Sequence, residues 1–150
     1  SLLAPYRDRP VRLLEIGVQQ GNSLRLWARY FEHAELIVGV DLVAPEQYLL
    51  NSKGFTTLIN VVEGDATVAA TFDGLGDFDI VIDDGSHLTA DVAQTFLILR
   101  DRVRPGGLYV IEDIQDDDER DSLQILDQFV EYDRREVIGR TDDRLLVWSN

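Results

Sequence analysis

Short apolar segments alternate with helical segments along most of this chain, and this alternation restricts the possible folds more than any other feature. The run 80–82 is β-branched and apolar throughout, which is typical of a strand covered on both faces. Alternating strands and helices favour a parallel, doubly wound α/β sheet. We expect strands at 12–18, 36–42, 57–62, 80–82, 108–111, 135–140 and 144–149, the last two forming a hairpin that adds an antiparallel strand.

The helices are indicated by apolar residues at helical spacing and by polar residues that can cap them. Asn22 or Ser23 can cap a first helix, and Ser86 or Thr89 a later one. Arg104-Pro105-Gly106-Gly107 is expected to end that later helix at Val103. The first of the expected helices carries Leu24, Trp27, Ala28 and Phe31 on one face. Three more cover 45–51, 66–72 and 89–103, and a last one carries Leu123, Leu126 and Val130. The acidic run 116–121 would precede this last helix and favour its dipole.

Composition excludes several classes of protein. The 150 residues are enough for a single domain, expected over 1–150, and their formal charge of −14 argues against a nucleic-acid surface. The chain contains no Cys, which excludes disulfides and fits a cytoplasmic protein. No apolar run approaches the roughly 20 residues needed to span a bilayer, so no membrane partner is expected.

Carboxylates and one imidazole follow two of the predicted strands. Asp83, Asp84 and His87 follow the strand at 80–82, while Glu112 and Asp113 follow the strand at 108–111. Neighbouring strands lie roughly 4.8 Å apart, so these groups would converge, and like charges that close raise pKa values or require a cation. Oxygen ligands favour Mg²⁺ first, with Mn²⁺ or Ca²⁺ as alternatives. In the simpler interpretation only one carboxylate of each pair faces the cleft.

His87 and the glycine-bearing turn at 15–21 are the other candidate site features. His87 can take a proton as a general base, or it can only cap or hydrogen-bond the loop. The turn has the spacing G-x-x-x-G between Gly17 and Gly21, a poor match to the dinucleotide fingerprint, which disfavours an NAD-type oxidoreductase. Asp41 ends the second strand and can accept hydrogen bonds from a ribose diol.

Three motifs together resemble a known family. They are Glu-Ile-Gly-Val-x-x-Gly-Asn-Ser-Leu-x-x-Trp at 15–27, Asp-Asp-Gly-Ser-His at 83–87, and Arg-Pro-Gly-Gly-Leu-Tyr-Val-Ile-Glu-Asp at 104–113. In this order they resemble the class I S-adenosylmethionine-dependent methyltransferases. More narrowly, they resemble the macrocin and mycinamicin sugar O-methyltransferases and the related cephalosporin hydroxylase group.

The resemblance implies a seven-stranded, Rossmann-like sheet whose last strand is antiparallel, and it implies a role for each matching residue. The cofactor residues would be Glu15, Gly17 and Gly21 at the methionine part, Ser23 at the helix start, Asp41 at the ribose, Asp65 near the adenine, and Asp83. Asp84, Glu112 and Asp113 would bind the metal, and Asp84 and His87 would act in catalysis, His87 as the general base. Family members carry extra N-terminal helices or a domain that cover the substrate and form oligomers, and we expect this cover segment to be missing here.

Two functions therefore follow from the sequence. The first is an S-adenosylmethionine-dependent O-methyltransferase, assisted by a divalent metal such as Mg²⁺, that methylates a hydroxyl of a small molecule such as a glycosylated natural product. The alternative is a non-catalytic cofactor-binding module of a larger assembly. The expected partners are a hydroxylated small-molecule substrate and a second copy of the chain in a homo-oligomer.

Overall fold

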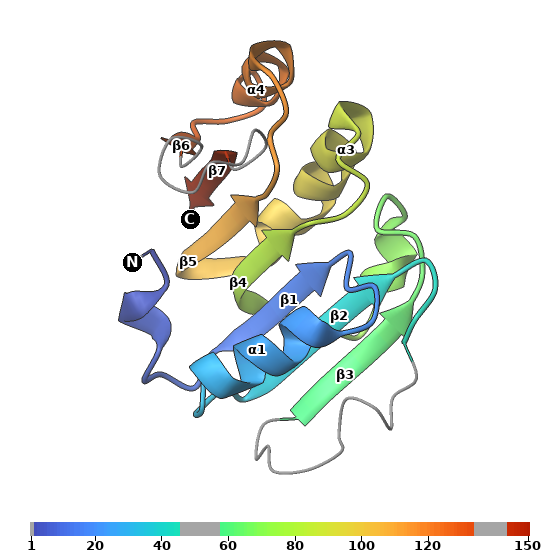
Figure 1. Cartoon of the computed structure of the whole chain (residues 1–150), viewed down its shortest axis with the longest axis vertical. Helices are drawn as coiled ribbons and strands as arrows, with labels where there is room; N and C mark the ends of the chain where they lie inside the picture. The colour runs from blue at the N-terminus through green and yellow to red at the C-terminus, as the bar shows by residue number, and fades with distance from the viewer. Residues whose placement is uncertain (1, 46–57, 134–143) are drawn as a thin grey trace.

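A seven-stranded sheet runs through the computed structural model, which describes residues 2–45, 58–133 and 144–150 (Figure 1). Its order is β3-β2-β1-β4-β5-β7-β6. Strands β1 to β5 are parallel, and β7 is antiparallel to both of its neighbours, as predicted. The strands are β1 (Arg12–Ile16), β2 (Leu36–Asp41), β3 (Leu58–Glu63), β4 (Phe78–Asp83), β5 (Val103–Ile111), β6 (Val130–Asp133) and β7 (Arg144–Ser149).

Helices cover the two faces of the sheet. α1 (Asn22–Tyr30) crosses in front of β1 and β2, and α3 (Thr89–Leu99) and α4 (Asp117–Gln124) pack on the opposite face (Figure 1). Short 3₁₀ helices are η1 (Ala4–Tyr6), η2 (Ala69–Phe72) and η3 (Arg100–Arg102). No helix in the described ranges is long and apolar enough to cross a membrane.

Alternation along the central strands produces two apolar cores. Leu13 of β1 packs in the cluster that includes Leu24 and Phe31 near α1, whereas its neighbour Leu14 packs in the cluster that includes Phe96 of α3. This period of two is what a strand buried on both faces requires. The sheet therefore packs against an apolar layer on each face.

The segment around Val103 differs from the prediction. Val103 begins β5 instead of ending a helix, and Gly106 and Gly107 lie inside that strand. The N–H of Gly106 donates to the carbonyl of Asn150, and the N–H of Asn150 donates to the carbonyl of Gly107. A Cβ on Gly107 would lie 2.7 Å from the carbonyl oxygen of Asp79, so this glycine permits the close approach of β4 and β5. The two glycines lie where the pairing of β4 and β5 is irregular. In sequence, such a glycine pair looks like the end of a helix.

The last helix also differs. α4 begins inside the acidic run, with Asp116 at its N-cap accepting a hydrogen bond from the N–H of Glu119 at 2.8 Å. Val130, expected on this helix, lies in β6, which forms the hairpin with β7. The strand expected at 135–140 and nearly all of the helix expected at 45–51 lie outside the described residues. Of the helix expected at 66–72, only the last four residues are helical, in η2.

The predicted helix caps are wrong as well. Gly21, with a φ of 73°, occupies the N-cap of α1, and Leu88 occupies that of α3, in neither case with a side-chain hydrogen bond. Instead, the hydroxyls of Ser23 and Ser86 donate hydrogen bonds to the carboxylates of Glu15 and Asp91.

Candidate functional site

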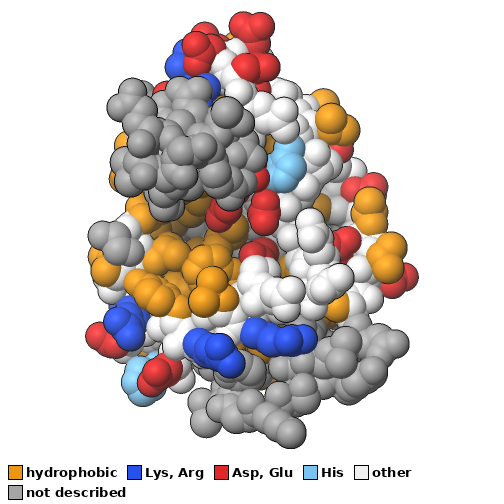
Figure 2. All heavy atoms as spheres, in the orientation of Figure 1, with side chains coloured by type: hydrophobic (Ala, Val, Ile, Leu, Met, Phe, Trp, Pro, Cys, Tyr) orange, Lys and Arg blue, Asp and Glu red, His pale blue; other side chains and the backbone are white. Residues whose placement is uncertain are grey.

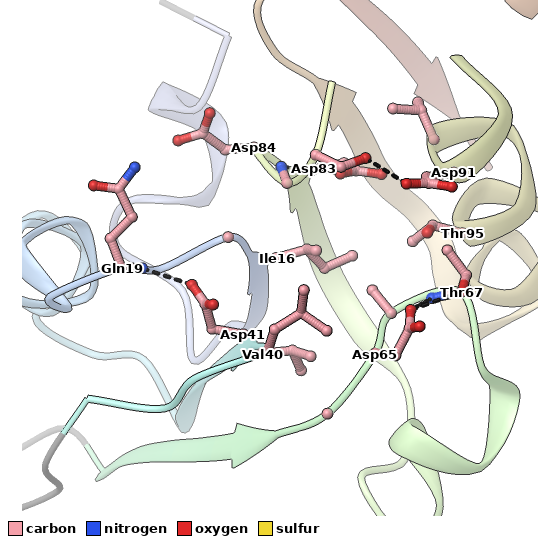
Figure 3. Close-up of a pocket in the computed structure, with 17 residues that line it drawn as sticks. Ile16, Gln19, Val40, Asp41, Asp65, Thr67, Asp83, Asp84, Asp91 and Thr95 are labelled. Atoms are coloured by element: carbon pink, nitrogen blue, oxygen red, sulfur yellow. Dashed lines mark hydrogen bonds between the residues drawn. The ribbon is translucent and has the colours of Figure 1, made fainter. Parts of the chain in front are cut away.

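A cavity of about 360 Å³ opens at the carboxyl ends of the first strands (Figure 3). This is the edge where ligands bind in doubly wound sheets. Its walls come from the segments after β1, β2, β3 and β4 and from the start of α3. The lining residues with polar side chains are Gln19, Asp41, Asp65, Thr67, Asp83, Asp84, Ser86, Asp91 and Thr95.

Asp41, at the end of β2, is oriented by the backbone. Its Oδ2 accepts a hydrogen bond from the N–H of Gln19 at 2.8 Å (Figure 3). Its Oδ1 accepts one from the N–H of Val43 at 3.3 Å. Gln19 takes a φ of 46°, in the left-handed region, to present that N–H. The carboxylate is thus held in place at the cavity wall before any ligand arrives.

Asp65 follows β3 on the opposite side of the cavity. Its Oδ1 accepts hydrogen bonds from the N–H of Thr67 at 2.8 Å and from its hydroxyl at 2.7 Å (Figure 3). These two bonds lower the pKa of Asp65 below its usual range, so the residue is a carboxylate at neutral pH.

Gly17 brings the end of β1 directly against the segment after β4. Its φ is +80°, and a Cβ there would lie 2.0 Å from the carbonyl oxygen of Asp84. No other residue type can occupy this position without moving one of the two strand ends. The predicted importance of Gly17 therefore has a structural cause in addition to any contact with a ligand.

Glu15 is a buried carboxyl beneath α1. Ser23 Oγ donates to its Oε2 at 2.8 Å, and Trp27 Nε1 donates to its Oε1 at 3.1 Å. Burial raises the pKa of Glu15 to about 7, although the two hydrogen bonds oppose the shift. Glu15, Gly21 and Ser23 lie outside the cavity lining, so their roles at the cofactor stay predictions.

Asp83, the last residue of β4, is almost fully buried where it lines the cavity. The hydroxyl of Tyr109 donates to its Oδ2 at 3.1 Å, and the N–H of Gly85 donates to its Oδ1 at 3.3 Å. Burial raises the pKa of Asp83 to about 6, against the effect of these hydrogen bonds.

Asp84, His87 and Asp113 form a compact group next to this cavity. Each offers one ligand atom, and these atoms lie within 4.8 Å of one another; among the residues that the structure describes, this is the one such group of three. His87 Nε2 lies 3.6 Å from Asp84 Oδ1. Figure 2 shows acidic side chains and a histidine gathered on this face of the molecule. Two carboxylates with a neighbouring imidazole can hold a divalent cation, so the donor set fits one.

The backbone at this group is unusual. His87 has a φ of 55° and Asp113 a φ of 54°, both in the region that side chains rarely adopt. Such conformations persist only where the surroundings enforce them, and they cluster at functional sites. Glu112, predicted as a metal ligand, lies next to Asp113, and its N–H donates to the carbonyl of Asp83 at 2.9 Å. Its carboxylate is not in the group of three, so its role as a ligand stays a prediction.

The sequence reasoning missed several residues at the site. Asp91 and Thr95 line the cavity from α3, and Ser86 Oγ donates to Asp91 Oδ2 at 2.8 Å (Figure 3). Their spacing of four on a helix places them on one face, a signal that could have been noticed. Tyr109 and the N–H of Gln19 carry no such signal, because their partners are distant in sequence.

The sheet order, the antiparallel strand β7 and the cavity at the switch between β1 and β4 define a Rossmann-like methyltransferase fold. The family model described as "Methyltransferase domain" matches residues 14–114, more than half of the chain, and the chain belongs to this family.

Particular relatives are sugar O-methyltransferases. The chain is 38% identical over 146 residues to the 8-demethyl-8-alpha-L-rhamnosyl tetracenomycin-C 2'-O-methyltransferase of Streptomyces olivaceus, an alignment covering 85% of this chain and 38% of that protein. It is 42% identical over 120 residues to the mycinamicin VI 2''-O-methyltransferase of Micromonospora griseorubida, covering 73% of this chain and 28% of that protein.

A solved methyltransferase structure is also similar to this chain. The MycE methyltransferase from the mycinamycin biosynthetic pathway, in complex with Mg, SAH and mycinamycin VI, matches with a TM-score of 0.64 and 40% identity, over 75% of this chain and 32% of that one. The chain thus spans between 28% and 38% of the length of these relatives.

Proposed function

We propose that this chain is the catalytic domain of an S-adenosylmethionine-dependent O-methyltransferase that acts on a hydroxyl of a glycosylated small molecule with the help of a divalent metal ion. The observation that carries the proposal is the position of Asp84, which lines the cavity and also belongs to the group with His87 and Asp113. A methyl donor in the cavity and an acceptor hydroxyl at the group would therefore meet at one side chain.

The cavity suits S-adenosylmethionine in its polar lining and in its charge. Asp41, held by Gln19, would accept hydrogen bonds from the hydroxyls of a ribose, and Asp65, which also lines the cavity, would lie near the base. The lining residues include five aspartates and no Lys or Arg, which suits a cationic sulfonium and disfavours the phosphates of a dinucleotide. The cofactor supplies the methyl group from its sulfonium.

Asp84 and Asp113 would hold the metal ion. Carboxylate oxygens are the preferred ligands of Mg²⁺, and an imidazole is a poorer one, which leaves His87 free for a proton. A bound divalent ion lowers the pKa of a hydroxyl that it coordinates. The relatives support the same ion, because the MycE structure was obtained in complex with Mg.

His87 would act as the general base. When the acceptor oxygen takes the methyl group from the sulfonium of the cofactor, which would leave as the neutral thioether, the hydroxyl proton would pass to the imidazole. Asp84 Oδ1, 3.6 Å from His87 Nε2, would stabilise the imidazolium that results. His87 has a positive φ, and its ring offers a nitrogen within 4.8 Å of an oxygen of each of the two carboxylates.

The relatives indicate the acceptor class. The two named above methylate a 2' or 2'' oxygen, in one case of a rhamnosyl-bearing compound. A sugar hydroxyl is a weak acid, so both a metal that lowers its pKa and a base that takes its proton would favour its attack, and the group of Asp84, His87 and Asp113 could supply both. Localisation in the cytoplasm and self-association remain predictions.

The decisive experiment is methyl transfer to a panel of glycosylated and plain hydroxylated compounds. We expect turnover that EDTA abolishes and Mg²⁺ restores. Asp113→Asn should lower the affinity for Mg²⁺ while leaving the affinity for S-adenosylhomocysteine unchanged, because Asp113 lies outside the cavity lining. Asp73→Asn, an exposed carboxyl away from the site, is the matched control. Full turnover in EDTA would refute the role of the metal, and cofactor binding without any turnover would favour the non-catalytic module.

A further inference from the structure

We propose that Tyr109, a core residue of β5, is a positioning residue for the group of Asp84, His87 and Asp113. Its hydroxyl joins β5, which leads to Asp113, to the end of β4, which leads to Asp84 and His87. The inference rests on the proposed function, because it concerns the site where the metal and the acceptor would bind.

The contact is a buried hydrogen bond between two strand ends. Tyr109 is fully buried, and its hydroxyl donates to Asp83 Oδ2 at 3.1 Å. The other carboxylate oxygen, Oδ1, accepts from the N–H of Gly85 at 3.3 Å. Asp83 is therefore held at both oxygens, once from the neighbouring strand and once from the turn that follows it.

The position of the Tyr109 ring leaves its hydroxyl little freedom. The ring of Phe96 in α3 packs edge-on against it, with centroids 5.2 Å apart and an interplanar angle of 88°. On the next strand, Trp148 lies opposite Tyr109 in the register of β5 and β7. A hydroxyl in such a core costs stability unless it is paired, and its partner here is the carboxylate of Asp83.

The hydrogen bond from Tyr109 to Asp83 lies close in sequence to two residues with a strained backbone. Asp84 follows Asp83 directly, and His87 and Asp113 both have positive φ values. A conformation of this kind relaxes when the contacts that enforce it are removed. The N–H of Glu112 also donates to the carbonyl of Asp83. The segment from Tyr109 to Glu112 therefore contacts Asp83 at both its side chain and its backbone. Removing the hydroxyl frees one oxygen of Asp83 and loosens the turn at Gly85.

Tyr109→Phe tests the inference, because it removes only the hydroxyl and keeps the ring. The matched control is Tyr6→Phe, which removes another buried tyrosine hydroxyl; it donates to the carbonyl of Gly106 at 2.6 Å, toward the other end of β5. The primary measurement is the affinity for Mn²⁺ and Mg²⁺ by calorimetry, which needs no turnover. The others are the affinity for S-adenosylhomocysteine, kcat and the thermal midpoint.

We expect the metal dissociation constant of Tyr109→Phe to rise about 5- to 20-fold and kcat to fall by a similar factor, as for the loss of a hydrogen bond to a charged group. Affinity for S-adenosylhomocysteine is measured beside it, because Asp83 and Gly85 also line the cavity. Tyr6→Phe should lose thermal stability without any change in metal affinity. Were Tyr109→Phe insoluble, Asp83→Asn should show the same weakened metal binding, because its amide cannot accept the hydrogen bonds of Tyr109 and Gly85 together in the same way.

Two different failures can be told apart. If the wild type binds the metal and Tyr109→Phe binds it equally well, Tyr109 only stabilises the core and this inference is wrong, while the proposed function stands. If the wild type binds no divalent metal, the metal in the proposed function is wrong, and the positioning role falls with it.

Discussion

At the scale of single residues, the backbone marks the site as clearly as the side chains do. The positive-φ residues other than glycine in the described chain are Gln19, His87 and Asp113, and each follows a strand of the sheet. Each carries a polar group to the edge where the cavity and the carboxylates lie. Such strain costs on the order of 1–3 kcal/mol per residue and persists where the surrounding structure enforces it.

The first prediction concerns His87. His87→Ala should lower kcat by roughly 10²–10⁴-fold, the range for a lost general base, while metal binding persists through Asp84 and Asp113. Raising the pH should restore part of the rate, because hydroxide then replaces the imidazole. His33→Ala, at the other histidine of the chain and exposed, is the control. A His87→Ala variant with wild-type turnover would leave the imidazole only a structural role.

The second prediction concerns Glu15 and pH. Its pKa of about 7 in the folded chain exceeds the model-compound value of 4.5, so the folded state holds the extra proton between these values. Stability from this residue is fully present below about pH 4.5 and is lost as the pH rises toward 7, by about 3 kcal/mol in total.

Glu15→Gln should therefore flatten the fall of the thermal midpoint between pH 5 and 7.5, in ~20 mM buffer with EDTA. The exposed Glu32→Gln is the control for the lost negative charge. Equal slopes for Glu15→Gln and the wild type would show that Glu15 is ionised in the folded chain throughout this range.

At the scale of secondary structure elements, the packing of β1 against β4 depends on a single glycine. Gly17→Ala should destabilise the fold and abolish cofactor binding, because the new Cβ would overlap the carbonyl of Asp84 in addition to opposing the positive φ. Gly74→Ala isolates the second effect, since Gly74 has a φ of +77° and nothing within 4 Å of its Cβ position. We expect a loss of about 1–2 kcal/mol for Gly74→Ala and at least twice that for Gly17→Ala in urea unfolding. Equal losses would contradict the close contact.

Some of these elements could be predicted from the sequence and others could not. The parallel strands were predictable because β-branched runs such as 80–82 are local signals, and carboxylates at strand ends converge in any doubly wound sheet. The start of β5 was not predictable, because Gly106 pairs with Asn150, 44 positions later in the chain. Tyr109 was missed for the same reason: its partner Asp83 is set by the register of β4 and β5.

At the scale of the whole molecule, charge is the dominant feature. The chain carries a net charge of −14 on 150 residues, so its acidic side chains repel one another and destabilise the folded state. Salt screens this repulsion, because the Debye length falls from about 30 Å at 0.01 M salt to about 8 Å at 0.15 M. We expect NaCl to raise the thermal midpoint over this range, with EDTA present so that no divalent ion contributes. The buried Arg144, which pairs with Glu131 at 2.6 Å and Asp117 at 3.0 Å, is screened less than exposed pairs. A midpoint that falls with salt would mean that ion pairs outweigh the net repulsion.

The order β5-β7-β6 has a consequence for how the chain is made. The ribosome synthesises β6 before β7. In the sheet, however, β5 pairs on its outer side with β7, Arg144–Ser149, and not with β6. Until those residues leave the ribosome, the strand that leads to Asp113 has one edge without a hydrogen-bonding partner, and β6 has no neighbour in the sheet. Nascent chains that stop before residue 144 should therefore be the ones that chaperones retain and that aggregate through an open edge.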